Sequence, residues 1–211
     1  MRALVLAGLA LLVPLRAPAG VQDAAGKGEG EKGWELSLAG SYYLVPHGPD
    51  RAQLVASGQH GDLHLEARYG YEAPRTVSAF VGWRFAFGDS VSLELTPLAG
   101  IALGDTRGLV PGLELTLAFW RFELYSESEY LFDLGSQDAS FMYQWAEATI
   151  SAPEWLRAGL ALQRTRLVHT STVLEVGPLV GVSFAPVSAS TSVFGLGTSD
   201  WYAVFSLGVD L

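Results

Sequence analysis

Residues 113–132 read LELTLAFWRFELYSESEYLF, and apolar and polar side chains alternate on both sides of Trp120-Arg121. Before this dipeptide every second residue is leucine, and after it every second residue from Glu123 to Glu129 is acidic or tyrosine. A period of two is typical of a half-buried β-strand, because successive side chains of a strand point to opposite faces. The stretch therefore predicts two antiparallel strands joined by a tight turn.

The same pattern continues in both directions, from Gly33 to Leu211. Most segments alternate clearly, whereas residues 51–58, 140–151 and 187–196 alternate more weakly. Tight turns near 59–60, 88–89, 120–121, 152–153 and 185–186 alternate with longer connections, which is typical of up-and-down membrane barrels with short periplasmic turns. We expect an all-β fold, a single up-and-down antiparallel transmembrane β-barrel of about 12 strands (roughly 10–14).

Composition agrees with a membrane barrel. Of the 211 residues 49% are hydrophobic and the mean hydropathy is +0.26, yet beyond residue 20 no apolar run reaches the length of about 20 residues that a spanning helix needs. Aromatic residues such as Trp34, Tyr42 and Trp83 lie near the ends of apolar faces, as in interfacial girdles. The alternative is a soluble sandwich or lipocalin-like barrel, whose strands also alternate but whose apolar face points inward.

The N-terminus has the features of a secretory signal peptide. Arg2 precedes an apolar core of about ten residues, and Ala17-Pro18-Ala19 fits the cleavage pattern. We expect a signal peptide over 1–19, a flexible leader over 20–32 and the barrel over 33–211. Cleavage near Ala24-Ala25 and an uncleaved membrane anchor are the alternatives.

Charge and cysteine content exclude several classes of function. The chain has no cysteine, which rules out disulfides, thiolate metal sites and a cysteine nucleophile. Its formal net charge is -9, which argues against nucleic acid as a partner. We expect no cofactor.

The last segment, residues 201–211 (WYAVFSLGVDL), resembles the C-terminal β-signal of Gram-negative outer-membrane barrel proteins. In that class the last strand alternates apolar residues, ends on an aromatic or apolar residue and is read by the barrel assembly machinery. Leu211 stands where phenylalanine is usual. The resemblance implies a location in a Gram-negative outer membrane, contact with its lipids and insertion by that machinery, and it brings no catalytic residues.

The face opposite the apolar residues holds the charged side chains, which we expect to line the lumen. This inward set contains ten carboxylates against three arginines: Glu35, Glu66, Glu94, Glu114, Glu123, Glu127, Glu129, Glu147, Glu175 and Asp210 with Arg68, Arg84 and Arg157. Three glutamates, Glu123, Glu127 and Glu129, share one strand face that carries no basic residue. Tyr43, Phe80, Tyr125, Tyr143, Trp145 and Tyr202 also point inward on this phasing and narrow the bore.

Two functions follow from an acid-rich lumen. The first is a narrow porin-like channel for small solutes, which rings of acidic side chains would make selective for cations. The second is a closed barrel that serves as an anchor, in which the arginines bridge carboxylates into a stiffening network. About twelve strands lie between barrels that side chains fill and barrels that leave a channel, so size does not separate the two.

An enzyme is the third and weakest class. His64 alternates with Glu66 on one inward face, where a serine from a neighbouring strand would complete a lipid hydrolase. The same pair has too few ligands for a metal site unless a third is added. We expect neither a catalytic nor a metal site.

Two arginines lie near the outer end of their strand. Arg164 and Arg166 are placed to meet phosphates of lipopolysaccharide in the outer leaflet. The alternative is ordinary snorkelling of long side chains toward water.

Overall fold

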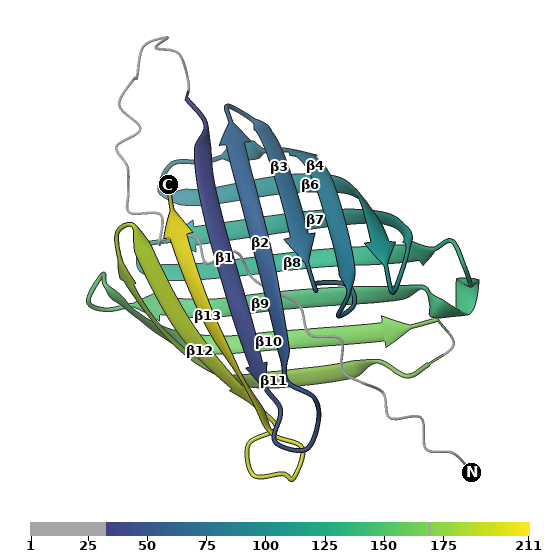
Figure 1. The fold of residues 1–211 in the computed structure, drawn as a ribbon. Helices are drawn as coiled ribbons and strands as arrows, with labels where there is room; N and C mark the ends of the chain where they lie inside the picture. Colours follow the sequence, from purple (N-terminus) through teal and green to yellow (C-terminus); the bar gives the residue numbers. More distant parts are fainter. Residues whose placement is uncertain (1–32, 169) are drawn as a thin grey trace.

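The computed structural model describes residues 33–168 and 170–211, so the predicted signal peptide and leader lie outside it. The described residues form a closed antiparallel barrel (Figure 1). Its strands are β1 Glu35–Leu44, β2 Arg51–His60, β3 Leu63–Tyr69, β4 Thr76–Trp83, β5 Phe85–Phe87, β6 Val91–Gly104, β7 Gly108–Phe119, β8 Phe122–Asp133, β9 Phe141–Ser151, β10 Leu156–Leu167, β11 Val173–Phe184, β12 Val187–Phe194 and β13 Tyr202–Asp210.

The barrel has twelve positions in its wall. Strands β4 and β5 both pair with β6 and are interrupted only at Arg84, so they occupy one position. Strand β1 pairs with β13, which closes the ring and leaves no free sheet edge. The predicted all-β, up-and-down barrel of about 12 strands is confirmed.

The two ends of the barrel differ in the length of their connections. Residues 61–62, 88–90, 120–121, 152–155 and 185–186 join strands at one end, called the turn end, together with both strand termini Glu35 and Asp210. Longer connections, 45–50, 70–75, 134–140, 168–172 and 195–201, and the short 105–107 form the loop end. Trp120 adopts a φ of 55°, the left-handed conformation that two-residue hairpin turns use.

Helical structure is almost absent from the described residues. The 3₁₀ helix η1 Gln137–Ala139 lies in the β8–β9 loop. No helix in the described part of the chain is long and apolar enough to cross a membrane.

Apolar side chains cover the outside of the wall. Leu38 and Tyr42 on β1 are close to half exposed, whereas Ala39, Ser41 and Tyr43 between and beside them are buried inside. The same division holds on β4. Its exposed residues, among them Val77 and Trp83, alternate one by one with buried residues, among them Thr76 and Phe80. A soluble barrel would place its apolar face inward, so this outward apolar band excludes the soluble alternative and suits hydrocarbon.

Side chains fill much of the interior. A chain of aromatic contacts runs from Trp145 to Phe194, Tyr202 and Tyr43, with ring centroids 5.0–6.5 Å apart. Phe80 lies on the opposite side, over Gly100, where any Cβ would overlap its ring. Glycine at position 100 is therefore required by the close approach of Phe80.

Candidate functional site

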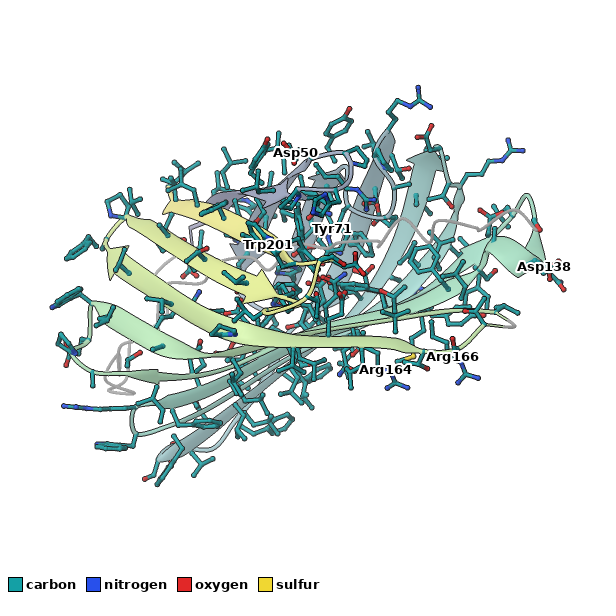
Figure 2. All side chains as sticks on the ribbon, turned by 90° about the horizontal axis from the view of Figure 1, so that it is seen from below. Asp50, Tyr71, Asp138, Arg164, Arg166 and Trp201 are labelled. Atoms are coloured by element: carbon teal, nitrogen blue, oxygen red, sulfur yellow. The ribbon has the colours of Figure 1, made fainter. Side chains whose placement is uncertain are left out.

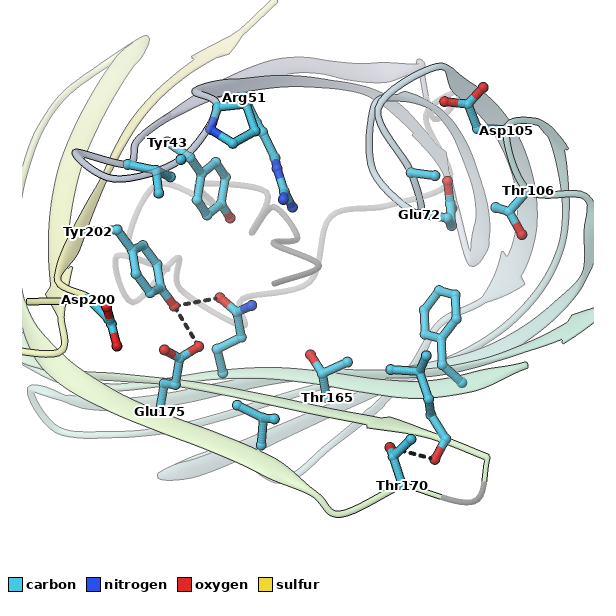
Figure 3. Close-up of a pocket in the computed structure, with 18 of the residues that line it drawn as sticks. Tyr43, Arg51, Glu72, Asp105, Thr106, Thr165, Thr170, Glu175, Asp200 and Tyr202 are labelled. Carbon is cyan, nitrogen blue, oxygen red and sulfur yellow. Dashed lines mark hydrogen bonds between the residues drawn. The ribbon is translucent and has the colours of Figure 1, made fainter. Parts of the chain in front are cut away.

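The loop end opens into a vestibule of about 710 Å³ (Figure 3). Tyr43 and Arg51 line one side of it, and Tyr202 and Glu175 line another. The Tyr202 hydroxyl is 3.0 Å from Glu175 Oε2 and 3.2 Å from Gln163 Oε1, so it bridges β13 to β10 and β11. These contacts tie three strands together in the wall of the vestibule.

The vestibule is strongly acidic. Five carboxylate side chains line it against one arginine, Arg51: Glu72, Asp105, Asp133, Glu175 and Asp200. Sequence reasoning found only Glu175, because the others lie in or next to loops, where no alternation exists to assign a direction. Arg51 was also missed, since it begins the weakly alternating segment 51–58.

Two loop carboxyls have shifted pKa values. Burial raises the pKa of Glu72, and the nearby Arg68 guanidinium opposes this only in part. The Tyr42 hydroxyl and the Val45 N–H both donate to Asp50 and hold the pKa of its carboxyl below the usual range. Asp50, in the exposed β1–β2 loop, is therefore held ionised, while Glu72, which lines the vestibule, binds protons more readily.

A charged cluster crosses the lumen below the vestibule. Arg68 of β3 reaches β8 on the facing wall, where its Nη1 is 2.8 Å from Glu127 Oε1 and also contacts Glu129. Its Nε donates to Glu66 Oε2 at 2.6 Å. The rings of Tyr71 and Phe80 lie over its guanidinium at 4.2 and 4.1 Å.

This cluster brings a cation from β3 to the acidic face of β8. Glu127 and Glu129 share a strand face without a basic residue, yet Arg68 pairs with both from across the barrel. All four charged side chains of the Arg68 cluster, defined as Glu66, Arg68, Glu127 and Glu129, are buried. Mutual repulsion is therefore offset by a shared cation rather than by water.

The remaining predicted inward residues lie apart from the Arg68 cluster. Arg157 Nη1 is 3.1 Å from Glu147 Oε2, and Trp145 Nε1 donates to the other oxygen of Glu147. Gly181 makes room for this arginine, because a Cβ there would lie 2.8 Å from Arg157 Nε. The rest are distributed along the inner face toward the turn end: Glu35, Arg84, Glu94, Glu114, Glu123 and Asp210.

His64 also lies toward the turn end. Its Nε2 is 3.2 Å from Glu66 Oε1 and its Nδ1 is 3.1 Å from Gln59 Oε1. Within residues 33–168 and 170–211 no serine is hydrogen-bonded to His64. The serine partner that a hydrolase would require is thus not at its side.

Arg164 and Arg166 lie on the outer wall, toward the loop end of β10 (Figure 2). Arg164 is opposite Gln144 of β9, whose Nε2 donates to Ser126 Oγ at 3.2 Å. A polar strip consequently interrupts the apolar surface on β8, β9 and β10.

Comparison with solved structures identifies the architecture. The barrel is similar to the KdgM porin, with a TM-score of 0.59 and 12% sequence identity over 82% of this chain and 97% of that one. It has the fold of an outer-membrane porin. A second structure, KdgM porin in complex with disordered oligogalacturonate, matches with a TM-score of 0.56 and 10% identity over the same shares.

A weaker likeness is to OpdQ of Pseudomonas aeruginosa, with a TM-score of 0.45 and 12% identity over 88% of this chain and 59% of that one. No protein-family model matches the chain, and no curated protein matches it. The resemblance to Gram-negative outer-membrane barrels that the C-terminal strand indicated is confirmed for the fold as a whole.

Proposed function

We propose that the chain is a narrow porin-like channel for small solutes in a Gram-negative outer membrane, with no enzymatic activity. In this proposal residues 1–19 are removed on export, the turn end faces the periplasm, and the C-terminal strand 201–211 directs insertion by the barrel assembly machinery. The acid-lined vestibule above a charged lumen is the observation that carries it.

The charge of the lumen selects the class of solute. Oligogalacturonate, named with one KdgM structure, is a polyanion. Here five carboxylates surround the vestibule and the inward face adds more, so a polyanion would meet repulsion before it reached the Arg68 cluster. The pathway accordingly suits small cationic or neutral solutes.

Cation preference should depend on the vestibule acids. Replacing Glu175 with Gln and Asp200 with Asn removes two charges at the cavity wall without touching the buried Arg68 cluster. We expect the reversal potential under a salt gradient in planar bilayers to shift toward zero, most at low salt, where screening is weakest.

Asp138→Asn is the matched control, because Asp138 is exposed on η1 of the β8–β9 loop and does not itself line the vestibule (Figure 2). The control removes one carboxylate charge, as each of the two vestibule substitutions does. It should leave the reversal potential near that of the parent. Anion preference in the parent barrel would refute the proposal.

The closed barrel is the second candidate, and one observation favours it. The lumen below the vestibule is packed in this conformation, because these inward side chains are each no more than 4% exposed: Tyr43, Glu66, Arg68, Glu127, Tyr143 and Phe194. Complete absence of conductance from correctly folded protein, with the vestibule still accessible to small probes, would support this candidate over a channel.

We also propose that Arg164 and Arg166 contact lipopolysaccharide phosphates. Replacing both with Gln removes about 1 kcal/mol of attraction to anionic headgroups for each arginine, so retention of labelled lipid A by the purified barrel should fall by roughly 5- to 30-fold. Arg121→Gln at the turn end is the control. If Arg121→Gln lowers lipid A retention equally, the two arginines only snorkel toward water. The same conclusion follows if the double variant loses dephosphorylated lipid A to the same extent.

A further inference from the structure

Three side chains with metal-ligand chemistry meet inside the barrel below the Arg68 cluster. His64 and Glu66 come from β3, and Glu114 comes from β7, which is separated from β3 in the wall by β4 and β6. One ligand atom of each residue lies within 4.8 Å of the corresponding atoms of the other two. The group, called the His64 triad, combines one imidazole nitrogen with two carboxylates.

Gln59 determines which nitrogen of His64 carries the proton in the neutral ring. The Gln59 amide donates from Nε2 to the carbonyl of Gly61 at 2.8 Å, which turns its Oε1 toward His64 Nδ1 at 3.1 Å. Because Oε1 can only accept, Nδ1 must donate. The neutral imidazole therefore presents the lone pair of Nε2 to the interior, which is how second-shell carbonyls orient metal-binding histidines.

That lone pair faces a carboxylate oxygen. His64 Nε2 is 3.2 Å from Glu66 Oε1, and apart from each other neither atom has a hydrogen-bond partner. Glu66 is buried, and its other oxygen is taken by Arg68. Two lone pairs at this distance repel each other unless a cation lies between them or the imidazole is protonated.

The separation suits a metal ion. Ligands at about 2.0–2.1 Å from a tetrahedral ion are themselves roughly 3.3 Å apart, close to the observed His64–Glu66 distance of 3.2 Å. Glu114 needs only a small side-chain movement to become the third ligand. The Tyr125 hydroxyl lies 3.2 Å from Glu114 Oε1 and 3.3 Å from Glu127 Oε2, so it links Glu114 to the Arg68 cluster beside the other two ligands.

We propose that His64, Glu66 and Glu114 bind a divalent transition-metal ion such as Zn²⁺, with water in the fourth position. One imidazole and two carboxylates form a nitrogen–oxygen ligand set that first-row ions of this kind accept. The His64 side chain is 13% exposed and lies beside the 61–62 turn, so the site is near the turn end of the barrel. This site is independent of whether the barrel conducts.

Metal binding is tested on the untagged, refolded barrel in detergent. Titration with Zn²⁺ alone should show one equivalent bound, and Co²⁺ should give the intense visible absorption of a low-coordinate site. We expect Glu114→Gln and His64→Gln each to weaken Zn²⁺ about 100-fold or more, and Gln59→Leu to weaken it about 10-fold because Gln59 acts only through His64. Heat-dependent gel migration checks that each variant is folded.

His47→Gln and Glu154→Gln are the matched controls, since each removes the same type of ligand from a connection between strands, outside the His64 triad. Both control variants should bind one equivalent of Zn²⁺ with the affinity of the parent protein. Absence of a stoichiometric Co²⁺ spectrum from the parent protein would overturn the proposal and leave an imidazolium–Glu66 ion pair. Equal weakening by the controls would overturn it in favour of scattered surface binding.

Discussion

Arg68→Ala is expected to lower the free energy of unfolding by about 3–5 kcal/mol. Arg68 is the cation that contacts all three carboxylates of its cluster, and the side chains involved are almost fully buried. Its removal leaves Glu66, Glu127 and Glu129 without that partner in a medium of low dielectric constant. Urea unfolding of the barrel from lipid vesicles, followed by tryptophan fluorescence, measures the change.

A rescue variant separates charge from packing. Arg68→Met combined with Glu127→Gln and Glu129→Gln keeps similar side-chain volumes and removes most of the unbalanced charge, so it should recover the greater part of the loss. Arg84→Ala is the arginine control, because Arg84 is only partly buried and donates to a single carbonyl, that of Gly61. If Arg84→Ala costs as much as Arg68→Ala, the cluster does not stabilise the fold in the way described.

Leu115→Arg is expected to cost about 2–4 kcal/mol, since it puts a charge on the lipid-facing wall. Leu115 lies within β7, cross-strand from Leu95 and Ser126 on the outer face. The neighbouring Thr116→Arg is the matched substitution on the inner face, where Glu94 lies opposite. It should cost far less.

Reversible folding into vesicles of defined thickness measures both variants under one condition. Because the two positions are adjacent, they share strand and approximate depth, and the introduced side chain is the same, so the face is the main difference. Equal destabilisation by the two arginines would mean that the inner and outer faces of β7 are assigned wrongly.

Much of the fold was predictable from alternation alone. The period of two along residues 113–132, with a two-residue turn at 120–121, assigns Glu114, Glu127 and Glu129 to one face. Short turns that alternate with longer connections imply an up-and-down barrel. The structure shows that same alternation, with leucines outside and charges inside. Local pattern is sufficient here because a strand between lipid and lumen has two distinct environments, one for each face.

Contacts across the lumen could not be predicted in this way. Alternation states that Arg68 and Glu127 point inward, but not that β3 and β8 face each other at the same height. Closure and register set that height, and both are properties of the whole ring. Part of the strand face that looked uniformly acidic is therefore paired with a cation 61 positions away in the chain, because Arg68 contacts Glu129 as well as Glu127.

The His64 triad shows the same division. His64 and Glu66 alternate on one strand and are visible in the sequence as a pair, whereas Glu114 joins them only once β3 and β7 are brought together by the curvature of the wall. The vestibule acids Glu72 and Asp200 lie in loops, whose direction no period encodes. The sequence pattern by itself determined which face each strand residue occupies, because the face depends on the neighbours along the same strand. Only closure of the barrel determined which residues meet across the lumen, because those residues lie on different strands.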